Sequence, residues 1–135
     1  MRRYVVIWNR NARQGAAAAE AKAELTALAG ANFHETESFE QACCILDDVR
    51  DEDLVIVAGG DGGINGIVNR VQSCCQSRPT LAIVSLGAGN DFVRSLGIHP
   101  DPLSTIAAIR LGRTVGGGAE VAPRARITRS NRSPR

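Results

Sequence analysis

A glycine-rich segment with one carboxylate in its middle is the part of this sequence best suited to chemistry. It reads Val55-Ile-Val-Ala-Gly-Gly-Asp-Gly-Gly-Ile-Asn65. The leading apolar residues are typical of a buried strand, Gly59–Gly63 of a tight turn, and the residues from Ile64 of an amphipathic helix. Glycines let a backbone approach an anion closely, and a helix N-terminus directs N–H groups and partial positive charge toward it. The segment therefore predicts a phosphate-binding turn.

Asp61 lies inside this turn, where its carboxylate would repel a phosphate unless a cation or a hydroxyl lies between them. The combination favours magnesium–nucleotide chemistry over simple dinucleotide binding. A structural role is open as well, because an aspartate in a turn can cap the helix that follows. The two roles of Asp61 are compatible with each other.

Apolar runs and helical spacing alternate along the chain. The continuous apolar runs typical of strands are residues 4–8, 54–58 and 81–86, and residues 32–36 are a short, poorly defined strand candidate. The segments with helical spacing are residues 15–29, 39–46 after the N-cap candidate Ser38, 64–75 and 103–110. Strands without internal alternation, separated by helices, indicate a parallel sheet covered on both faces. We therefore predict an α/β fold, a three-layer, doubly wound domain with a mostly parallel sheet.

Three loops are expected at one edge of this sheet. They are residues 9–15, the turn Gly59–Gly63, and a second glycine turn, Gly87-Ala88-Gly89, with Asn90 and Asp91 directly after it. Each follows a strand, and the carboxyl ends of parallel strands share one edge, where open α/β sheets bind their ligands. The sequence therefore predicts a single site that these loops build together.

The two glycine turns, taken together, resemble the diacylglycerol kinase catalytic domain family. The matching residues are Gly59-Gly60-Asp61-Gly62-Gly63-Ile64-Asn65 and Leu86-Gly87-Ala88-Gly89-Asn90-Asp91-Phe92. This family includes bacterial lipid kinases, sphingosine kinases and ceramide kinases, and it is distantly similar to NAD kinases. The resemblance covers residues 3 to 112, and two motifs at compatible spacing are more specific than one glycine turn.

The resemblance implies a domain that uses ATP and Mg²⁺ to phosphorylate a lipid hydroxyl, such as that of diacylglycerol, at a membrane surface. Asp61 is the candidate catalytic residue, through magnesium or through the acceptor hydroxyl, and the metal ligands stay open. The nucleotide-binding residues that the resemblance implies are Asn9, Thr36, Gly59, Gly60, Asp61, Gly62, Gly63, Ile64, Asn65, Gly66, Gly87, Ala88, Gly89, Asn90 and Asp91.

Several side chains depart from the family pattern. Gly63 stands where the family has threonine, Gly66 where it has glutamate, and Ala88 where it has threonine, and the loop after Asn9 lacks the usual proline. Each lost hydrogen bond to a charged group is worth about 1.5–3 kcal/mol. The backbone contacts of the site would remain, so we expect weakened nucleotide binding.

Length and charge set the domain boundary near residue 112. Residues 1–111 carry 10 basic and 13 acidic side chains, whereas residues 112–135 carry six basic and one acidic. We predict a nucleotide-binding domain over 1–112 and a basic, Gly/Arg-rich, disordered tail over 113–135. A contact of the tail with anionic lipid or nucleic acid, and a truncated or frame-altered end, are alternatives. The acidic globular part argues against a nucleic-acid partner.

The lengths of the apolar runs and the spacing of the cysteines indicate the cellular compartment. No apolar run approaches the ~20 residues that span a bilayer, and the first run is too short for a signal peptide. The adjacent pairs Cys43-Cys44 and Cys74-Cys75 lack metal-type spacing and are typical of reduced thiols. We predict a cytoplasmic protein that meets its lipid at the inner face of the membrane.

Family members continue into a second, β-rich domain. The resemblance therefore implies that this chain is incomplete by itself, and it leaves homodimerisation open.

Three functions other than a lipid kinase are possible for such a sequence. A non-catalytic module that binds nucleotide or a partner protein is one alternative, and an NAD kinase-like enzyme is another. A dinucleotide-binding oxidoreductase is disfavoured, because the loop after Trp8 lacks the Gly-x-Gly-x-x-Gly spacing.

Overall fold

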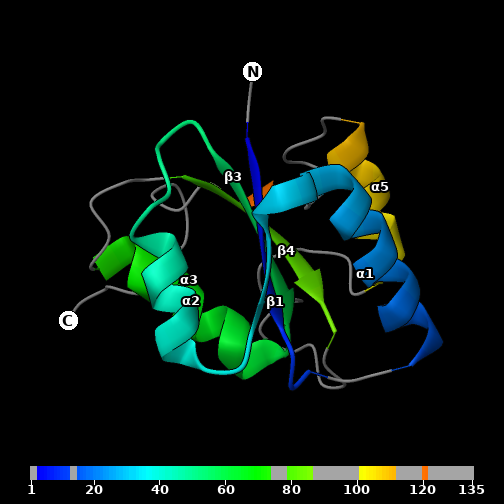
Figure 1. Cartoon of the computed structure of the whole chain (residues 1–135), viewed down its shortest axis with the longest axis horizontal. Coiled ribbons are helices and arrows are strands. Elements are labelled where there is room, and N and C mark those ends of the chain that lie inside the picture. The colour runs from blue at the N-terminus through cyan, green and yellow to red at the C-terminus, as the bar shows by residue number, and fades with distance from the viewer. Residues whose placement is uncertain (1–2, 13–14, 74–78, 87–100, 112–119, 122–135) are drawn as a thin grey trace.

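The structure is a computed structural model, and it describes residues 3–12, 15–73, 79–86, 101–111 and 120–121 (Figure 1). Strands and helices alternate through most of this part of the chain. In order they are β1 (Tyr4–Asn9), α1 (Ala16–Ala29), the 3-10 turn η1 (Gly30–Asn32), β2 (Phe33–Thr36), α2 (Phe39–Leu46), β3 (Leu54–Gly59), α3 (Asp61–Ser73), β4 (Thr80–Ser85), α5 (Pro102–Arg110) and β5 (Glu120–Val121).

The strands form one sheet in the order β2-β1-β3-β4-β5. The first four are parallel, with Val6 of β1 opposite Phe33 of β2 and Ile56 of β3. β5 is antiparallel to β4 and pairs through two residues. The prediction of a mostly parallel sheet is therefore confirmed.

Helices cover both faces of the sheet and complete three layers. α1 and α5 lie on one face, and α2 and α3 on the other (Figure 1). Successive side chains of a strand point to opposite faces, so Val5 and Ile7 of β1 enter the core under α2 and α3. Val6 and Trp8 enter the second core under α1 and α5. Both faces of each central strand are therefore apolar, which explains why the sequence shows continuous apolar runs there.

Helix α2 begins where the sequence predicts. The Ser38 side chain accepts a hydrogen bond from the Gln41 N–H at 3.2 Å, as an N-cap residue does. The Gln41 side chain accepts in return from the N–H of Glu37 at 2.6 Å. Two N–H groups at the start of α2 are thus satisfied by the chain itself.

Helix α3 begins three residues before the predicted start at Ile64. The Ile64 N–H donates to the carbonyl of Gly60 at 3.0 Å, so Asp61, Gly62 and Gly63 form the first helical turn. We predicted a separate glycine turn before the helix, and that boundary was wrong. The reason is that glycine in a first helical turn adopts ordinary helical angles. The described positive φ angles occur elsewhere, at Gly15 and Gly30.

The strand β5 lies within the segment for which the sequence predicts a disordered tail. Its two residues pair with Leu81 and Ala82 of β4. The other residues from 112 onward lie outside the described part of the chain. The domain boundary at residue 112 therefore stays a prediction.

The described helices are short compared with the thickness of a bilayer. α1 is the longest, with 14 residues. Within the described ranges, no helix is long and apolar enough to cross a membrane.

An ion pair joins the amino ends of three strands. Asp53 is buried, and its carboxylate accepts from Arg3 Nε at 3.2 Å and from the Arg3 terminal nitrogen at 2.6 Å. It also accepts from the backbone N–H of Arg50 at 2.9 Å, while the Asp53 carbonyl accepts from Thr80. Burial alone would raise the pKa of Asp53, but the hydrogen bonds from Arg3 and Arg50 outweigh it and lower the pKa.

Replacing Asp53 by alanine is expected to destabilise the fold. The change removes three hydrogen bonds to a charged group, and we expect a loss of about 1–3 kcal/mol in the free energy of unfolding, since Arg3 is partly solvated. Chemical denaturation at pH 7 measures it. The exposed neighbour Glu52→Ala is the matched control and should change stability by less than about 0.5 kcal/mol.

The same variant should show a characteristic pH dependence. The pKa of Asp53 is lowered in the folded chain, so its contribution is complete above the unfolded pKa of about 3.9. It disappears as the pH falls through the lower pKa of the folded state. The difference in stability between the parent and Asp53→Ala should therefore shrink as the pH falls below about 4, and a difference that stays constant as the pH falls would contradict this role.

Candidate functional site

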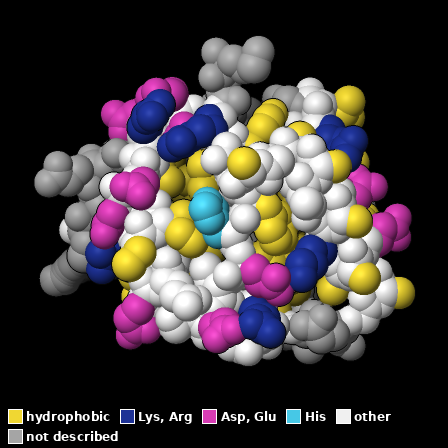
Figure 2. Space-filling view, viewed as in Figure 1, with side chains coloured by type: hydrophobic (Ala, Val, Ile, Leu, Met, Phe, Trp, Pro, Cys, Tyr) yellow, Lys and Arg dark blue, Asp and Glu magenta, His cyan; other side chains and the backbone are white. Residues whose placement is uncertain are grey.

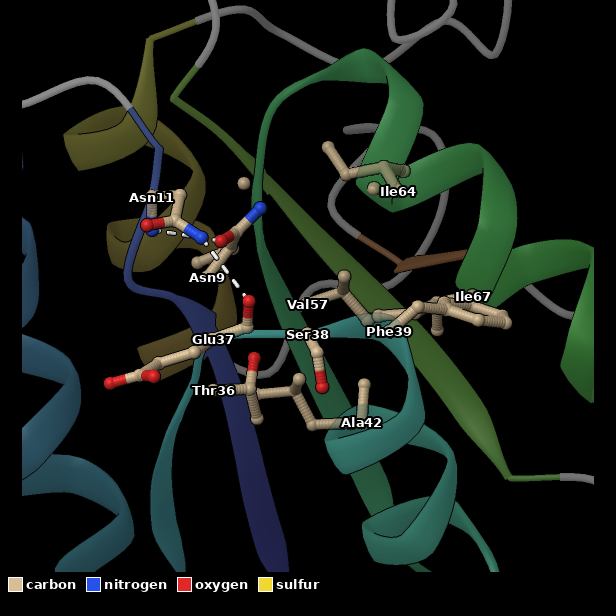
Figure 3. Close-up of a pocket in the computed structure, with 14 residues that line it drawn as sticks. Asn9, Asn11, Thr36, Glu37, Ser38, Phe39, Ala42, Val57, Ile64 and Ile67 are labelled. Carbon is tan, nitrogen blue, oxygen red and sulfur yellow. Dashed lines mark hydrogen bonds between the residues drawn. The ribbon is translucent and has the colours of Figure 1, made fainter.

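A cavity of about 180 Å³ opens at the carboxyl ends of β1 and β3, between the first turns of α2 and α3 (Figure 3). It lies at the sheet edge where the sequence predicts ligand binding. Its lining residues are Ile7, Asn9, Asn11, Thr36, Glu37, Ser38, Phe39, Ala42, Val57, Ala58, Gly59, Gly63, Ile64 and Ile67.

Asn9 lies across the cavity from the start of α3. Its Oδ1 accepts a hydrogen bond from the Asn11 backbone N–H at 2.9 Å, which orients the amide. A Cβ atom at Gly59 would lie 3.3 Å from Asn9 Cβ, a tight contact, so a larger residue at 59 would have to displace Asn9 by a few tenths of an ångström. A Cβ atom at Gly63 would lie 3.5 Å from Asn9 Nδ2, an ordinary contact distance. The Asn9 amide therefore faces the first turn of α3.

The loop after β1 is fastened to the end of β2. The Arg10 N–H donates to the Thr36 carbonyl at 2.8 Å, and Asn11 Nδ2 donates to the Glu37 carbonyl at 3.2 Å. Arg10 and Glu37 also form an ion pair. The Thr36 hydroxyl donates to the Trp8 carbonyl at 3.3 Å and is buried. The hydroxyl proton of Thr36 is therefore used in a hydrogen bond within the fold, while the hydroxyl oxygen can still accept a hydrogen bond from a ligand.

The two helix N-termini at the cavity differ in how their N–H groups are used. Those of α2 are capped by Ser38 and Gln41, as described above. In α3 the N–H groups of Gly62 and Gly63 belong to the first turn, where a helix has no carbonyl oxygen four residues earlier to accept their hydrogen bonds. A Cβ atom at Gly62 would meet nothing within 4 Å, so the space beside this turn is open. The start of α3 is therefore the better anion-binding end.

The end of β4 lies next to the same turn. The Leu86 N–H donates to the Gly59 carbonyl at 2.8 Å, which brings the residue before the second glycine turn beside the first. This supports the predicted convergence of the two turns. Residues Gly87, Ala88, Gly89, Asn90 and Asp91 themselves lie outside the described residues, so their contacts stay predictions.

The structure brings some of the predicted binding residues into the cavity and leaves others outside. Those that line it are Asn9, Thr36, Gly59, Gly63 and Ile64. Those described at the start of α3 without lining it are Gly60, Gly62, Asn65 and Gly66. The side chain of Asp61 is not among the described ones, so its role stays a prediction.

Asn65 points along its own helix and away from the cavity. It is exposed, and its Oδ1 accepts from Asn69 Nδ2 at 3.3 Å. Residues 65 and 69 are one helical turn apart, which explains the contact. The contribution of Asn65 to nucleotide binding stays a prediction.

Sequence reasoning missed several lining residues from the start of α2. Phe39 was assigned to the helical apolar stripe, yet its side chain is 46% exposed at the cavity. Glu37 and Asn11 were not singled out. The available signal was the N-cap Ser38, because a helix that begins directly after a parallel strand places its first turn at the ligand-binding edge.

The described lining is nearly neutral. Glu37 is its one ionisable side chain, and its described members include no lysine or arginine. No group of three His, Cys, Asp or Glu side chains suited to a metal ion occurs in the described parts of the chain. On the face shown in Figure 2, basic and acidic side chains are interspersed, and the described residues form no large basic patch there. Backbone N–H groups, amides and the Ser38 hydroxyl are thus the described donors of the cavity.

Comparison with known proteins agrees with the geometry. A family model for the diacylglycerol kinase catalytic domain matches residues 3–117. Diacylglycerol kinase of Bacillus subtilis (strain 168) is 50% identical over 50 residues, which cover 37% of this chain and 16% of that protein. Diacylglycerol kinase of Staphylococcus carnosus (strain TM300) is 37% identical over 65 residues, which cover 48% of this chain and 21% of that protein.

A solved structure shows the same fold. The crystal structure of a "putative diacylglycerol kinase" from Bacillus anthracis str. Sterne superposes with a TM-score of 0.62 at 28% identity. The match covers 82% of this chain and 41% of that chain, so this chain spans only part of the relatives it matches. The family match runs from the first strand past α5 and confirms the resemblance found in the sequence. This chain belongs to the diacylglycerol kinase catalytic domain family.

Proposed function

We propose that this chain carries the nucleotide-binding half of a lipid kinase site, which uses ATP and Mg²⁺ to phosphorylate a lipid hydroxyl such as that of diacylglycerol. The observation that carries the proposal is the cavity that Asn9 and the glycine-rich first turn of α3 both line. It lies at the carboxyl edge of the sheet, where such folds bind nucleotides.

Backbone N–H groups and one side-chain amide are the groups of this chain that we propose to bind the phosphates. We propose that the N–H groups of Gly62 and Gly63, together with the amide of Asn9, donate to the phosphates at the start of α3. Asn9 contacts the Gly63 position, whereas a Cβ atom at Gly62 would meet nothing within 4 Å among the described residues, so a phosphate group fits beside Gly62. Phosphoryl transfer depends mainly on positioning and on charge neutralisation, and the donors described here serve the first of these.

Magnesium is proposed for the second requirement. The described lining has no cationic side chain to balance a triphosphate, and a bound Mg²⁺ would supply that charge. Asp61, at the start of α3, is the residue that we propose to hold the ion, through water, or to orient the acceptor hydroxyl. Since the substrate would be a lipid, we propose that the protein works in the cytoplasm at the inner membrane face.

A non-catalytic nucleotide-binding module is the second candidate function. Gly63 and Gly66 supply no side chain where the family has threonine and glutamate, while the backbone donors remain. Such a site would bind nucleotide without turning it over. The lipid-binding groups are not assigned in either case.

One experiment separates these functions. Purified protein is titrated with ATP by calorimetry, with and without Mg²⁺, and is incubated with labelled ATP and diacylglycerol micelles. Labelled phosphatidic acid would support the kinase, and ATP binding without turnover would support the module. Failure to bind ATP under both conditions would contradict the proposed site.

Replacing Asp61 tests its proposed link to magnesium. If the carboxylate holds Mg²⁺, ATP affinity in Asp61→Asn should lose its dependence on the Mg²⁺ concentration. Calorimetric titration at several Mg²⁺ concentrations measures this. Glu52→Gln removes the same charge at the opposite edge of the sheet and should keep the dependence. An unchanged dependence in Asp61→Asn would assign the residue to helix capping.

Restoring threonine at residue 63 should strengthen ATP binding. A Cβ atom fits there, 3.5 Å from Asn9 Nδ2, and the new hydroxyl could donate to a phosphate oxygen. A hydrogen bond to a charged group is worth about 1.5 kcal/mol or more, so Gly63→Thr should bind ATP about tenfold more tightly. Gly63→Val has nearly the same shape without the hydroxyl, and it should bring no gain. An equal gain in both variants would refute the hydrogen bond.

A further inference from the structure

Phe39 is an exposed aromatic side chain at the edge of the candidate cavity. Its side chain is 46% exposed, and among the described large hydrophobic residues only Leu111 is also exposed. Figure 3 shows Phe39 extending from the start of α2 toward Ile67 of α3. A single exposed hydrophobic residue is normal on a protein surface, but an aromatic ring that lines a ligand cavity offers a flat apolar surface to the ligand.

The missing side chain of Gly66 makes room for this ring. A Cβ atom at Gly66 would lie 3.1 Å from Phe39 Cε1, 3.5 Å from Cδ1 and 3.8 Å from Cζ. Any larger residue at 66 would therefore press directly on one edge of the ring. Phe39 thus lies against the backbone of α3 through that edge, and it also lines the cavity.

The cavity has a polar end and an apolar end. Asn9, Asn11 and Gly63 lie at the polar end, beside the first turn of α3. Phe39 and Ile67 lie toward the other end (Figure 3). A ligand that matches both ends carries an anionic group at one end and a flat apolar group at the other. A nucleotide has this form.

We propose that the Phe39 ring is the surface on which the base of the bound nucleotide stacks, and that Gly66 keeps the space for the ring. This inference rests on the proposed nucleotide-binding function and adds a determinant of base recognition to it. Stacking accepts every base, since each has a π-face, so Phe39 contributes affinity without selecting adenine.

The test compares ATP with inorganic tripolyphosphate, which lacks the base. Calorimetry uses the full chain and the variants Phe39→Ala, Phe39→Leu and Phe39→Trp. Base stacking is worth about 1–3 kcal/mol by alanine substitution, so Phe39→Ala should weaken ATP binding about tenfold or more. Phe39→Leu, apolar but not flat, should weaken it similarly, and Phe39→Trp should retain it. Tripolyphosphate binding should be the same in all four proteins.

A second variant tests the role of Gly66. Gly66→Gln should displace the ring and weaken ATP binding in the parent chain, but should have little further effect in the Phe39→Ala background. Leu111→Ala removes the other exposed hydrophobic side chain, away from the cavity, and should change nothing. Circular dichroism and thermal unfolding show that each variant is folded.

The outcomes separate this inference from the function on which it rests. Equal ATP affinity in the parent, Phe39→Ala and Phe39→Leu overturns the stacking role alone. Parallel losses of ATP and tripolyphosphate binding also overturn it, because they show a structural effect. Additive losses for Gly66→Gln and Phe39→Ala overturn the pairing with Gly66. A parent chain that binds neither ligand overturns the proposed function and the stacking role together.

Discussion

The pairing of β1 with β3 is the interaction on which the rest of the structure depends. The register from Tyr4 opposite Leu54 to Trp8 opposite Ala58 sets which loops meet at the carboxyl edge. It brings Asn9 so close to Gly59 that a Cβ atom there would lie 3.3 Å from Asn9 Cβ. Because helices cover both faces of the sheet, the edge is the place left for a ligand, and the cavity lies there. The position of the site is thus a consequence of strand register and not of any one reactive side chain.

The backbone supplies most of the polar character of this site. Ser38 caps the first turn of α2 by accepting from the Gln41 N–H, whereas the glycines at the start of α3 carry no side chain. Both helices start at the same cavity. The phosphate-binding end that we propose therefore relies on backbone groups, which remain where side chains of the family pattern are missing.

Much of the fold and part of the site could be predicted from the sequence. Continuous apolar runs identified β1, β3 and β4, since a strand buried on both faces shows that pattern, and Ser38 identified the start of α2. The edge strand β2 has only one apolar residue, Phe33, so the sequence marked it only as a poorly defined candidate. The start of α3 was missed because glycines in a first helical turn look like a separate turn. Phe39 was missed because helical spacing reports which residues share a face and not whether that face is covered. β5 pairs through only two residues, which is too short for any periodicity to reveal.

The ion pair of Arg3 and Asp53 lies at the opposite edge of the sheet from the cavity, and this separation bears on how such a domain can evolve. The Arg3–Asp53 ion pair and its neighbouring backbone hydrogen bonds connect the strands at their amino ends, and they involve no residue at the carboxyl ends. Residues 63 and 66 are not partners of this ion pair, so substitutions there leave the contact between the amino ends of the strands in place. Side chains at the site can then be exchanged in evolution without loss of that contact.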